Sequence, residues 1–448
     1  MADKPVEMTK RLAEFIVHTP ASAIPQTVFD HAKVALLDWL GVTLAGKDDL
    51  PVTKLLHYAD LMGGRDQCVI IGHRQRKSIC QAALINGAAG HALDYDDSLI
   101  AFLGHPSVTL FPGILALAEW KKSSGRDLLA AYLIGLRTGV AIAAGSGFEH
   151  YLSGYHGTST MGALASAAAC SRLLDLDTRQ TAFALGIGGT QAGGLKRVFG
   201  TMCKPFHAGH AAEVGVTAAL LASDGFTSAE DILEGPEGFF QAMKGSVNED
   251  SLKTLGHTWA IENLAQKYHA SCHATHSPIE AALAIVKREK IALEDIRSIQ
   301  VKVSATALSA AFRNDAHTGL EGKFCIPYCV ANALLRGNTG LQAFTDEKVA
   351  DKDVRQFMDK ISTHQDPEIK ALDARVHLQT VDGARHDAYS DIFQEIPGLA
   401  VKQEKIKAKF TDLSVPVIGK ERTAELIRVI ESLEKTDNLK GLFDLLYP

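Results

Sequence analysis

The sequence lacks the features that mark several large classes of protein. No cluster of lysine and arginine forms a basic stripe, and the formal net charge is −6, so nucleic-acid binding is not expected. The seven cysteines are an odd number and form no Cys-x-x-Cys pair, which indicates reduced thiols rather than a disulfide framework. No Gly-x-Ser-x-Gly elbow and no Gly-Lys-Ser/Thr phosphate loop occur, so neither a serine hydrolase nor a nucleotide-binding protein is indicated.

Long apolar segments are also missing. The start, MADKPVEMTKR, is charged, and the most apolar run, Leu128 to Leu136, stops at Arg137, far short of a membrane span. We therefore expect a cytoplasmic protein with neither a secretion signal nor a membrane span. Hydrophobic residues make up 46% and charged residues 22%, so a well-filled core is possible in one large helical domain with a smaller neighbour.

Apolar periodicity predicts a mainly α protein with an α+β second domain. Helical spacing dominates up to about residue 265 and returns at 423–446, whereas Ile299–Val303 and Ala374–Leu378 alternate as strands do. We therefore predict a large all-helical domain from residues 1–267 and 403–448, and a smaller α+β domain from residues 268–402. The helices predicted in the first part are 78–92, 110–123, 125–144, 160–174, 178–186 and 211–224.

The stretch HALDYDDSLIAFLGH, residues 91–105, gathers acidic side chains between two predicted helices. Asp94, Asp96 and Asp97 lie within four positions, and burying unpaired carboxylates is costly, which favours a functional role. Together with His105 they could bind a divalent cation, or one aspartate could orient the histidine for acid–base work. The alternative is a helix end followed by a solvated acidic turn.

Two further segments carry candidate polar groups. His156 in GYHGTSTMG precedes a small-residue helix and suits a general acid or base, although it could equally stand beside a hydroxyl-rich N-cap. Lys204 lies in FGTMCKPFHAGHAAEVG, where Pro205 is expected to forbid helix at the lysine. A helix starting near His207 would point its N-terminus at this turn and form an anion site. The alternative is a surface loop with an extended lysine.

The segment KYHASCHATH, residues 267–276, is a rival signal for a metal. His269, Cys272, His273 and His276 would share one face of a helix, which is a credible zinc arrangement. Pro278 instead indicates a loop that enters a helix, and a loop would splay these ligands. The zinc interpretation therefore depends on whether this segment is helical.

The candidate residues share a chemical character. Lys204 and Lys267 suit a substrate with two or three carboxylates, and His105 and His156 suit proton movement near neutral pH. Holding a polyanion among cations stabilises the charge that develops when a proton leaves the carbon next to a carboxylate. Elimination, epimerisation or decarboxylation would then be possible. Tyr328 could be a phenol donor, or simply a core tyrosine.

Six segments, in chain order, are similar to the MmgE/PrpD family. Its members include 2-methylcitrate dehydratase, cis-aconitate decarboxylase and iminodisuccinate epimerase. The resemblance implies a helical domain from both chain ends, an α+β lid domain, a homodimer, and catalysis without metal or cofactor. The segments are GHALDYDD, GHPSVTLFPG, GYHGTSTMGALASAAA, FGTMCKPFHAGHAAEVGVTAALLASDGFT, ILEGPEGF and KYHASCHATH.

The resemblance also implies site residues. Cys272 stands where the decarboxylase has a catalytic histidine, five residues after Lys267, which argues against decarboxylation. His269 or His273 could substitute for it, and with His207 we expect them to bind substrate. The residues carried over from the family pattern are Asp94, Ser98 (where a threonine is usual), His105, His156, Lys204, Lys267 and Tyr328.

Our leading hypothesis is a cofactor-free lyase that dehydrates a hydroxylated di- or tricarboxylate such as 2-methylcitrate. An iminodisuccinate-type epimerase, a cis-aconitate-type decarboxylase, and a zinc-binding or non-catalytic polycarboxylate-binding protein are the alternatives. His156 or His105 would move the proton, the two lysines would clamp carboxylates, and Asp94 would orient a histidine. Asp96 and Asp97 should cap helices or pair with basic neighbours, so Asp97→Asn should mainly lower stability.

Overall fold

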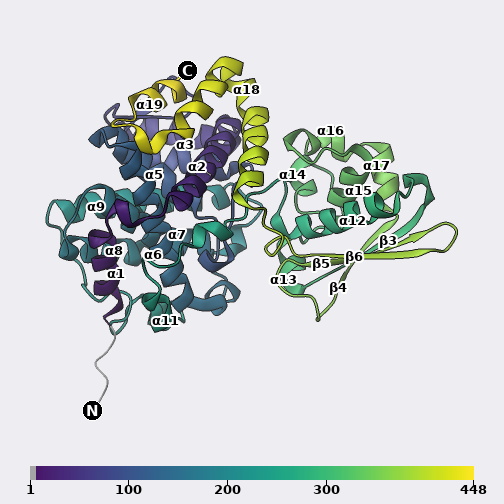
Figure 1. Ribbon diagram of the computed structural model, residues 1–448, viewed down its shortest axis with the longest axis horizontal. Coiled ribbons are helices and arrows are strands. Elements are labelled where there is room, and N and C mark those ends of the chain that lie inside the picture. The colour runs from purple at the N-terminus through teal and green to yellow at the C-terminus, as the bar shows by residue number, and fades with distance from the viewer. Residues whose placement is uncertain (1–6) are drawn as a thin grey trace, which may run out of the picture. The chain divides into compact units, whose positions relative to one another are not determined.

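The chain folds into two compact units, seen in a computed structural model that describes residues 7–448 (Figure 1). The first unit contains the described residues up to Gln266 together with Gly398–Pro448, and the second contains Lys267–Pro397. Both boundaries differ from the prediction: Lys267 belongs to the second unit, and the chain returns to the first unit before residue 403. Residues 1–6, part of the charged start, lie outside the described chain.

The first unit is helical, with one small antiparallel pair of strands. The late helices α18 and α19 belong to this unit, and α18 packs against α2 from the other end of the chain (Figure 1). Its elements are α1 Met8–His18, α2 Gln26–Gly46, α3 Leu50–Met62, β1 Cys68–Val69, β2 Arg76–Lys77, α4 Ile79–Ala92, α5 Ser107–Lys121, α6 Gly125–Leu152, α7 Gly157–Leu173, α8 Thr178–Gln191, α9 Cys203–Ser223, α10 Phe239–Ala242, α11 Glu249–Lys253, α18 Leu399–Glu431 and α19 Lys440–Leu446.

Helices α4, α7 and α9 form the centre of this unit. Small residues line α7, nearly all of its positions are buried, and it packs against α9. Helix α4 crosses α9 at Gly87 and Gly209, where a Cβ added to Gly209 would lie 2.1 Å from the carbonyl oxygen of Leu84. Glycine is therefore required there for the two backbones to approach, and this contact sets the spacing of the two helices that carry the site.

Helix α6 is longer than the apolar run predicted to stop at Arg137. By length and composition it could span a membrane, yet 89% of its most apolar window is buried inside the structure, as in a core helix. The helix passes through Arg137 because the buried guanidinium donates to the carbonyl oxygen of Ser251 and to Oγ1 of Thr254, both at 2.8 Å. These two hydrogen bonds satisfy one end of the guanidinium, while its Nε has no partner in the described chain.

Two helix boundaries differ from the prediction because close packing overrides local propensity. The helix predicted over residues 178–186 continues as α8 to Gln191, and its Gly186 lies against Ser228 with no room for a side chain. Helix α18 starts at Leu399 rather than near residue 423, and Gly419, with φ of 80°, kinks it.

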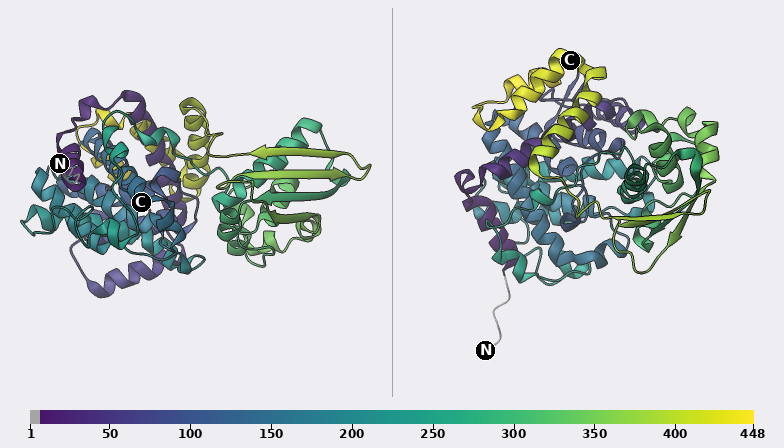
Figure 2. Two further views of the ribbon diagram at one scale, coloured as in Figure 1. Left: turned by 90° about the horizontal axis from the view of Figure 1, so that it is seen from below. Right: turned by 45° about the vertical axis from the view of Figure 1, so that its right-hand side comes forward.

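The second unit is a four-stranded sheet with helices on one face (Figure 2). The strand order is β4-β3-β5-β6, in which β3 pairs with β4 in parallel and with β5 antiparallel. Buried residues alternate with exposed or partly buried residues along β5, as expected for a sheet covered on one side. These two units confirm the predicted fold class. The elements are α12 His276–Glu289, β3 Ile296–Val303, α13 Ala305–Ala310, α14 Gly319–Gly322, α15 Ile326–Arg336, α16 Asp346–Val349, α17 Lys352–Met358, β4 Ile361–Gln365, β5 Ala374–Thr380 and β6 Arg385–Ser390.

Candidate active site

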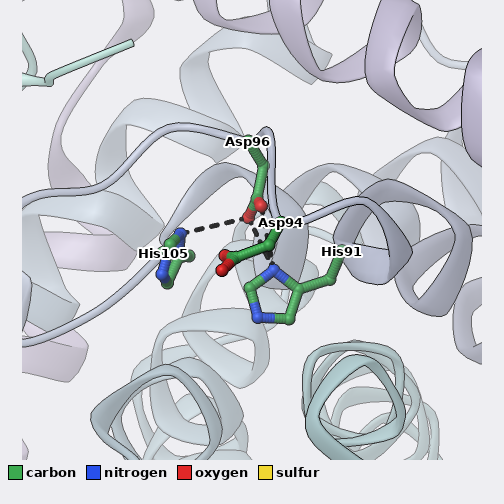
Figure 3. Close-up of side chains that lie close together, drawn as sticks. All are labelled: His91, Asp94, Asp96 and His105. Atoms are coloured by element: carbon green, nitrogen blue, oxygen red, sulfur yellow. Dashed lines mark hydrogen bonds and ion pairs between the residues drawn. The ribbon is translucent and has the colours of Figure 1, made fainter. Parts of the chain in front are cut away.

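The predicted acidic stretch forms a buried cluster at the end of α4 (Figure 3). His91 lies in the last turn of α4, and the chain reverses at Asp94, whose φ of 51° is in the left-handed region that aspartate tolerates better than most residues. Asp94 is 7% exposed and Asp96 is fully buried. The stretch is therefore not a solvated acidic turn.

Asp96 joins two imidazole rings. His91 Nδ1 lies 2.9 Å from both carboxylate oxygens of Asp96, and His105 Nδ1 lies 3.3 Å from one of them (Figure 3). Although burial raises the pKa of Asp96, the two histidines lower it well below its usual range. Asp96 thus pairs with basic neighbours, as expected, but His91 was missed because a histidine within an alanine-rich helix carries no signal of its own.

The contacts of His105 fix its tautomer. Its Nδ1 lies 2.7 Å from the backbone carbonyl oxygen of Asp97, which can only accept a hydrogen bond, so Nδ1 carries the proton. Its Nε2 then has a free lone pair and can act as a base. The backbone N–H of His105 donates to Thr158 Oγ1 at 3.2 Å, which ties this loop to the start of α7.

Asp97 differs from its neighbour Asp96 in charge. It is buried, and burial raises its pKa well above the usual range, which favours the protonated form of the carboxyl. One of its oxygens accepts from the backbone N–H of Ser107 at 3.4 Å, at the first residue of α5. Asp97 therefore sits at a helix N-terminus, in line with the expectation of a capping residue.

Lys204 pairs with Asp94. Its Nζ lies 2.8 Å from Asp94 Oδ1, and both side chains are largely buried. The prediction that Lys204 lies in a turn before a helix is wrong, because α9 already begins at Cys203 and includes the lysine. Pro205 is tolerated in the first helical turn, where its missing N–H would have had no partner within the helix.

His156 and His207 bring a pair of imidazoles to the same region. His156 is 3% exposed and precedes α7, and its Nδ1 lies 3.1 Å from Nδ1 of His207 on α9. Burial lowers the pKa of His156 well below its usual range, and the neighbouring His91 and Lys204 lower it further. His156 is therefore neutral at pH 7 and can accept or pass on a proton.

Four residues of the cluster could also offer ligands to a cation. One ligand atom from each of His91, Asp94, Asp96 and His105 lies within 4.8 Å of the others. Both histidines, however, direct Nδ1 at Asp96, and Asp94 faces the ammonium of Lys204, which would repel a cation. We therefore assign no metal to this cluster.

The remaining predicted residues lie in or next to the second unit. Residues 267–276 are not one helix: His273 starts a short 3-10 turn and α12 begins at His276, so the zinc ligands do not share a helical face. His269 contacts Thr339 Oγ1 at 2.7 Å and Glu280 at 3.0 Å. A role for this segment towards a site in the first unit stays a prediction.

Other carried-over residues have structural partners. Tyr328 is fully buried and its hydroxyl donates to the carbonyl oxygen of Ala343, as a core tyrosine would. The backbone of Ser98 forms an antiparallel bridge with Ala265, at 2.9 Å in both directions. Lys267 is 1% exposed, and Cys272 donates its backbone N–H to the carbonyl oxygen of Lys323. Their roles towards substrate stay predictions.

Comparison with known proteins gives two family matches that together span most of the chain. Residues 10–250 match the MmgE/PrpD N-terminal domain, and residues 269–435 match the MmgE/PrpD C-terminal domain. The gap between the two matches, from residue 250 to residue 269, contains the point at which the second unit begins, Lys267.

Several characterised proteins are distantly similar over long stretches. The chain is 26% identical to the cis-aconitate decarboxylase of Mus musculus, with 98% of this chain and 93% of that protein covered. It is 27% identical to a cis-aconitate decarboxylase-like protein of Aspergillus oryzae, with 98% and 97% covered. A mitochondrial 2-methylcitrate dehydratase of Yarrowia lipolytica is 27% identical over 61% of this chain and 56% of its own length.

Proposed function

This chain belongs to the MmgE/PrpD family, and from that premise we propose that it is a lyase that dehydrates a hydroxylated di- or tricarboxylate such as 2-methylcitrate. Its distant relatives include 2-methylcitrate dehydratases, which supports this reaction class. We further propose that the reaction needs no metal or cofactor, because the ammonium of Lys204 already pairs with Asp94 and would repel a metal ion there.

The observation that carries the proposal is the buried pair of Lys204 and Asp94 in the same cluster as a histidine with a free Nε2. Lys204 binds a substrate carboxylate and stabilises the negative charge that develops on it when the adjacent C–H bond breaks. His105 Nε2 takes that proton. The electron pair of the C–H bond forms the new C=C bond, and the C–O bond on the neighbouring carbon breaks.

The departing hydroxide needs a proton to leave as water. His156 is buried and touches His207, which is only partly buried, so the pair connects the cluster with groups nearer the solvent. A proton delivered to His156 from His207 can be passed to the leaving oxygen. In this scheme Asp94 keeps the lysine in place, and the backbone carbonyl of Asp97 together with Asp96 holds His105 in its active tautomer.

Decarboxylation of a cis-aconitate-like substrate is the second candidate. Relatives named cis-aconitate decarboxylase match 98% of this chain, more than the dehydratase relatives do. Both reactions begin from a substrate carboxylate held by a cation. Cys272, at the place where the decarboxylase has a histidine, favours dehydration.

Purified enzyme with a chelator and 2-methylcitrate or citrate should develop the ultraviolet absorbance of a C=C bond conjugated with a carboxylate. Lys204→Met should reduce this rate at least about a hundredfold, because it removes charge stabilisation in the transition state. Lys440→Met, at an exposed ion pair, is the matched control and should leave the rate unchanged. Absence of any signal with either substrate would refute dehydration.

The oligomeric state and location are proposals as well. The family resemblance supports a homodimer, which sedimentation should reveal as one species of twice the chain mass. The buried cysteines Cys68, Cys170, Cys325 and Cys329 form no disulfide in the described structure, which supports a reducing compartment such as the cytoplasm.

A further inference from the structure

His91 has one ring nitrogen that the described protein leaves without a hydrogen bond. Its Nε2 is buried and has no partner among residues 7–448, while its Nδ1 contacts Asp96. The side chain as a whole is fully buried. A buried polar atom without a partner is costly, and a bound molecule that supplies the missing partner is one explanation for it.

The contact with Asp96 determines what this nitrogen can bind. Because the carboxylate of Asp96 only accepts, His91 Nδ1 carries the proton and Nε2 carries a lone pair. Burial lowers the pKa of His91 to about 4, so the ring is neutral at pH 7. Nε2 is therefore a hydrogen-bond acceptor, and it would disfavour a carboxylate, which has no proton to donate.

The surroundings place this acceptor beside the proposed catalytic groups. The ring centroid of His91 lies 4.7 Å from that of His105 and 6.2 Å from that of His156. Figure 3 shows the second ring nitrogens of His91 and His105 both turned away from Asp96. The charge of Lys204 is also close enough to act on His91.

We propose that His91 Nε2 accepts a hydrogen bond from the hydroxyl group of the substrate, and so selects hydroxylated over unhydroxylated polycarboxylates. The inference rests on the proposed function and assigns the recognition of the hydroxyl to one atom. Lys204 binds a carboxylate, His105 faces the C–H bond, and His91 orients the hydroxyl that leaves. A site built to pair with a hydroxyl rejects the analogue that lacks it, because its own buried polar atom is then left unpaired.

The test compares two ligands that differ by one hydroxyl group. Citrate and tricarballylate carry the same three carboxylates, and only citrate has the hydroxyl. Calorimetry on the full chain should show citrate binding about tenfold more tightly. In His91→Asn, whose amide NH₂ can still donate to Asp96 but which has no atom at Nε2, the ratio should fall to about one while tricarballylate affinity is kept.

Two further measurements keep the inference falsifiable if His91→Asn is unstable. His91→Gln, with an amide oxygen near the Nε2 position, should retain part of the preference for citrate. In the wild-type chain, the ¹⁵N resonance of His91 Nε2 should move with citrate and stay in place with tricarballylate. An equal shift with both ligands, or an unchanged ratio in His91→Asn, would overturn the role of His91.

The outcome is separable from that of the proposed function. If the chain shows the citrate preference and its loss in His91→Asn but no dehydration, the recognition stands and the reaction is wrong. If the chain dehydrates its substrate but the ratio of citrate to tricarballylate affinity is unchanged in His91→Asn, only the role of His91 is refuted. A wild-type chain that binds neither ligand would overturn both the recognition and the proposed substrate class.

Discussion

Asp96 and Asp97 are neighbours in sequence and both buried, yet their contacts shift their pKa values in opposite directions. Asp96 accepts from two imidazole N–H groups, which keeps it ionised despite its burial. One carboxyl oxygen of Asp97 accepts a hydrogen bond from Ser107 at the N-terminus of α5, and the other has no partner in the described chain. Burial is therefore the largest influence on Asp97, and it raises the pKa of this carboxyl. Asp96 therefore belongs to the cluster of histidines, whereas burial favours the protonated form of Asp97.

Asp97→Asn should stabilise the protein at neutral pH, contrary to the expectation from sequence. Because the folded pKa of Asp97 is raised, the folded state keeps a proton that the unfolded chain releases above pH 4, so wild-type stability falls as pH rises. Asparagine removes this penalty. Urea unfolding should show a gain of at least about 1 kcal/mol at pH 7 that vanishes near pH 4. A loss at both pH values would contradict the assignment.

The contribution of His156 to the free energy of unfolding should change with pH in the direction opposite to that of Asp97. Its folded pKa is lowered, so the unfolded chain binds a proton that the folded chain does not, and stability is lost as pH falls below about 6.5. In His156→Gln, the pH dependence of the unfolding free energy between pH 5 and 6 should be shallower by about one proton, or 1.4 kcal/mol per pH unit. An unchanged slope would show that His156 is protonated in the folded state.

The sequence allowed several site residues to be predicted but not their tautomers. Asp94, His105, His156 and Lys204 meet in the first unit as the clustering of polar motifs suggested. His91 was missed, because its role depends on an acid five positions away whose direction is set by the reversal at Asp94. Hydrogen-bond direction at buried rings is a tertiary property that spacing does not encode.

At the scale of helices, the site depends on how closely α4 approaches α9. Helix α4 leads into Asp94, and α9 carries Lys204 and His207 in its first two turns. The two helices touch backbone to backbone at Gly87 and Gly209. Their separation therefore sets the distance between the acid and the lysine.

Gly209→Ala should separate Lys204 from Asp94. The added methyl would lie 2.1 Å from the carbonyl oxygen of Leu84, which is backbone and cannot move alone, so α9 must shift. We expect a loss of about 1–3 kcal/mol in the free energy of unfolding and a loss of about a hundredfold in kcat/KM. Gly441→Ala, with nothing within 4 Å, is the control and should be neutral or slightly stabilising. Full activity in Gly209→Ala would contradict this account.

Helix existence was predictable, whereas helix ends often were not. The periodic apolar segments 78–92 and 125–144 do correspond to α4 and α6, with Ser78 as the N-cap of α4. The early start of α9 and the late end of α8 depend on a proline in a first turn and on glycines packed against a neighbour. Such contacts are made by distant residues, so local propensity gave the wrong boundary.

At the scale of the whole molecule, a late helix completes the first unit. Lys409 on α18 places its Nζ 2.7 Å from Asp38 on α2 and 2.8 Å from the carbonyl oxygen of Tyr95. Both charged side chains are almost completely buried. The ion pair therefore ties the last part of the chain to an early helix and to the acidic stretch.

Lys409→Met should leave the charge of Asp38 buried without its ammonium partner. Breaking such a pair costs about 3–5 kcal/mol, which urea unfolding at pH 7 should detect. Asp38→Asn combined with Lys409→Met should recover most of that loss, because no uncompensated charge remains. If the free energy of unfolding of Lys409→Met alone lay within about 1 kcal/mol of the wild-type value, the pair would not tie α18 to α2.

The central claim is that Lys204 and its neighbouring histidines remove a proton next to a bound carboxylate without a metal. Proton NMR of the chelator-treated chain with 2-methylcitrate in D₂O tests it most directly. The predicted result is the appearance of alkene product as substrate disappears, at a rate that chelator does not change and that Asp94→Asn abolishes. No conversion, or conversion only after a divalent cation is added, would contradict the claim.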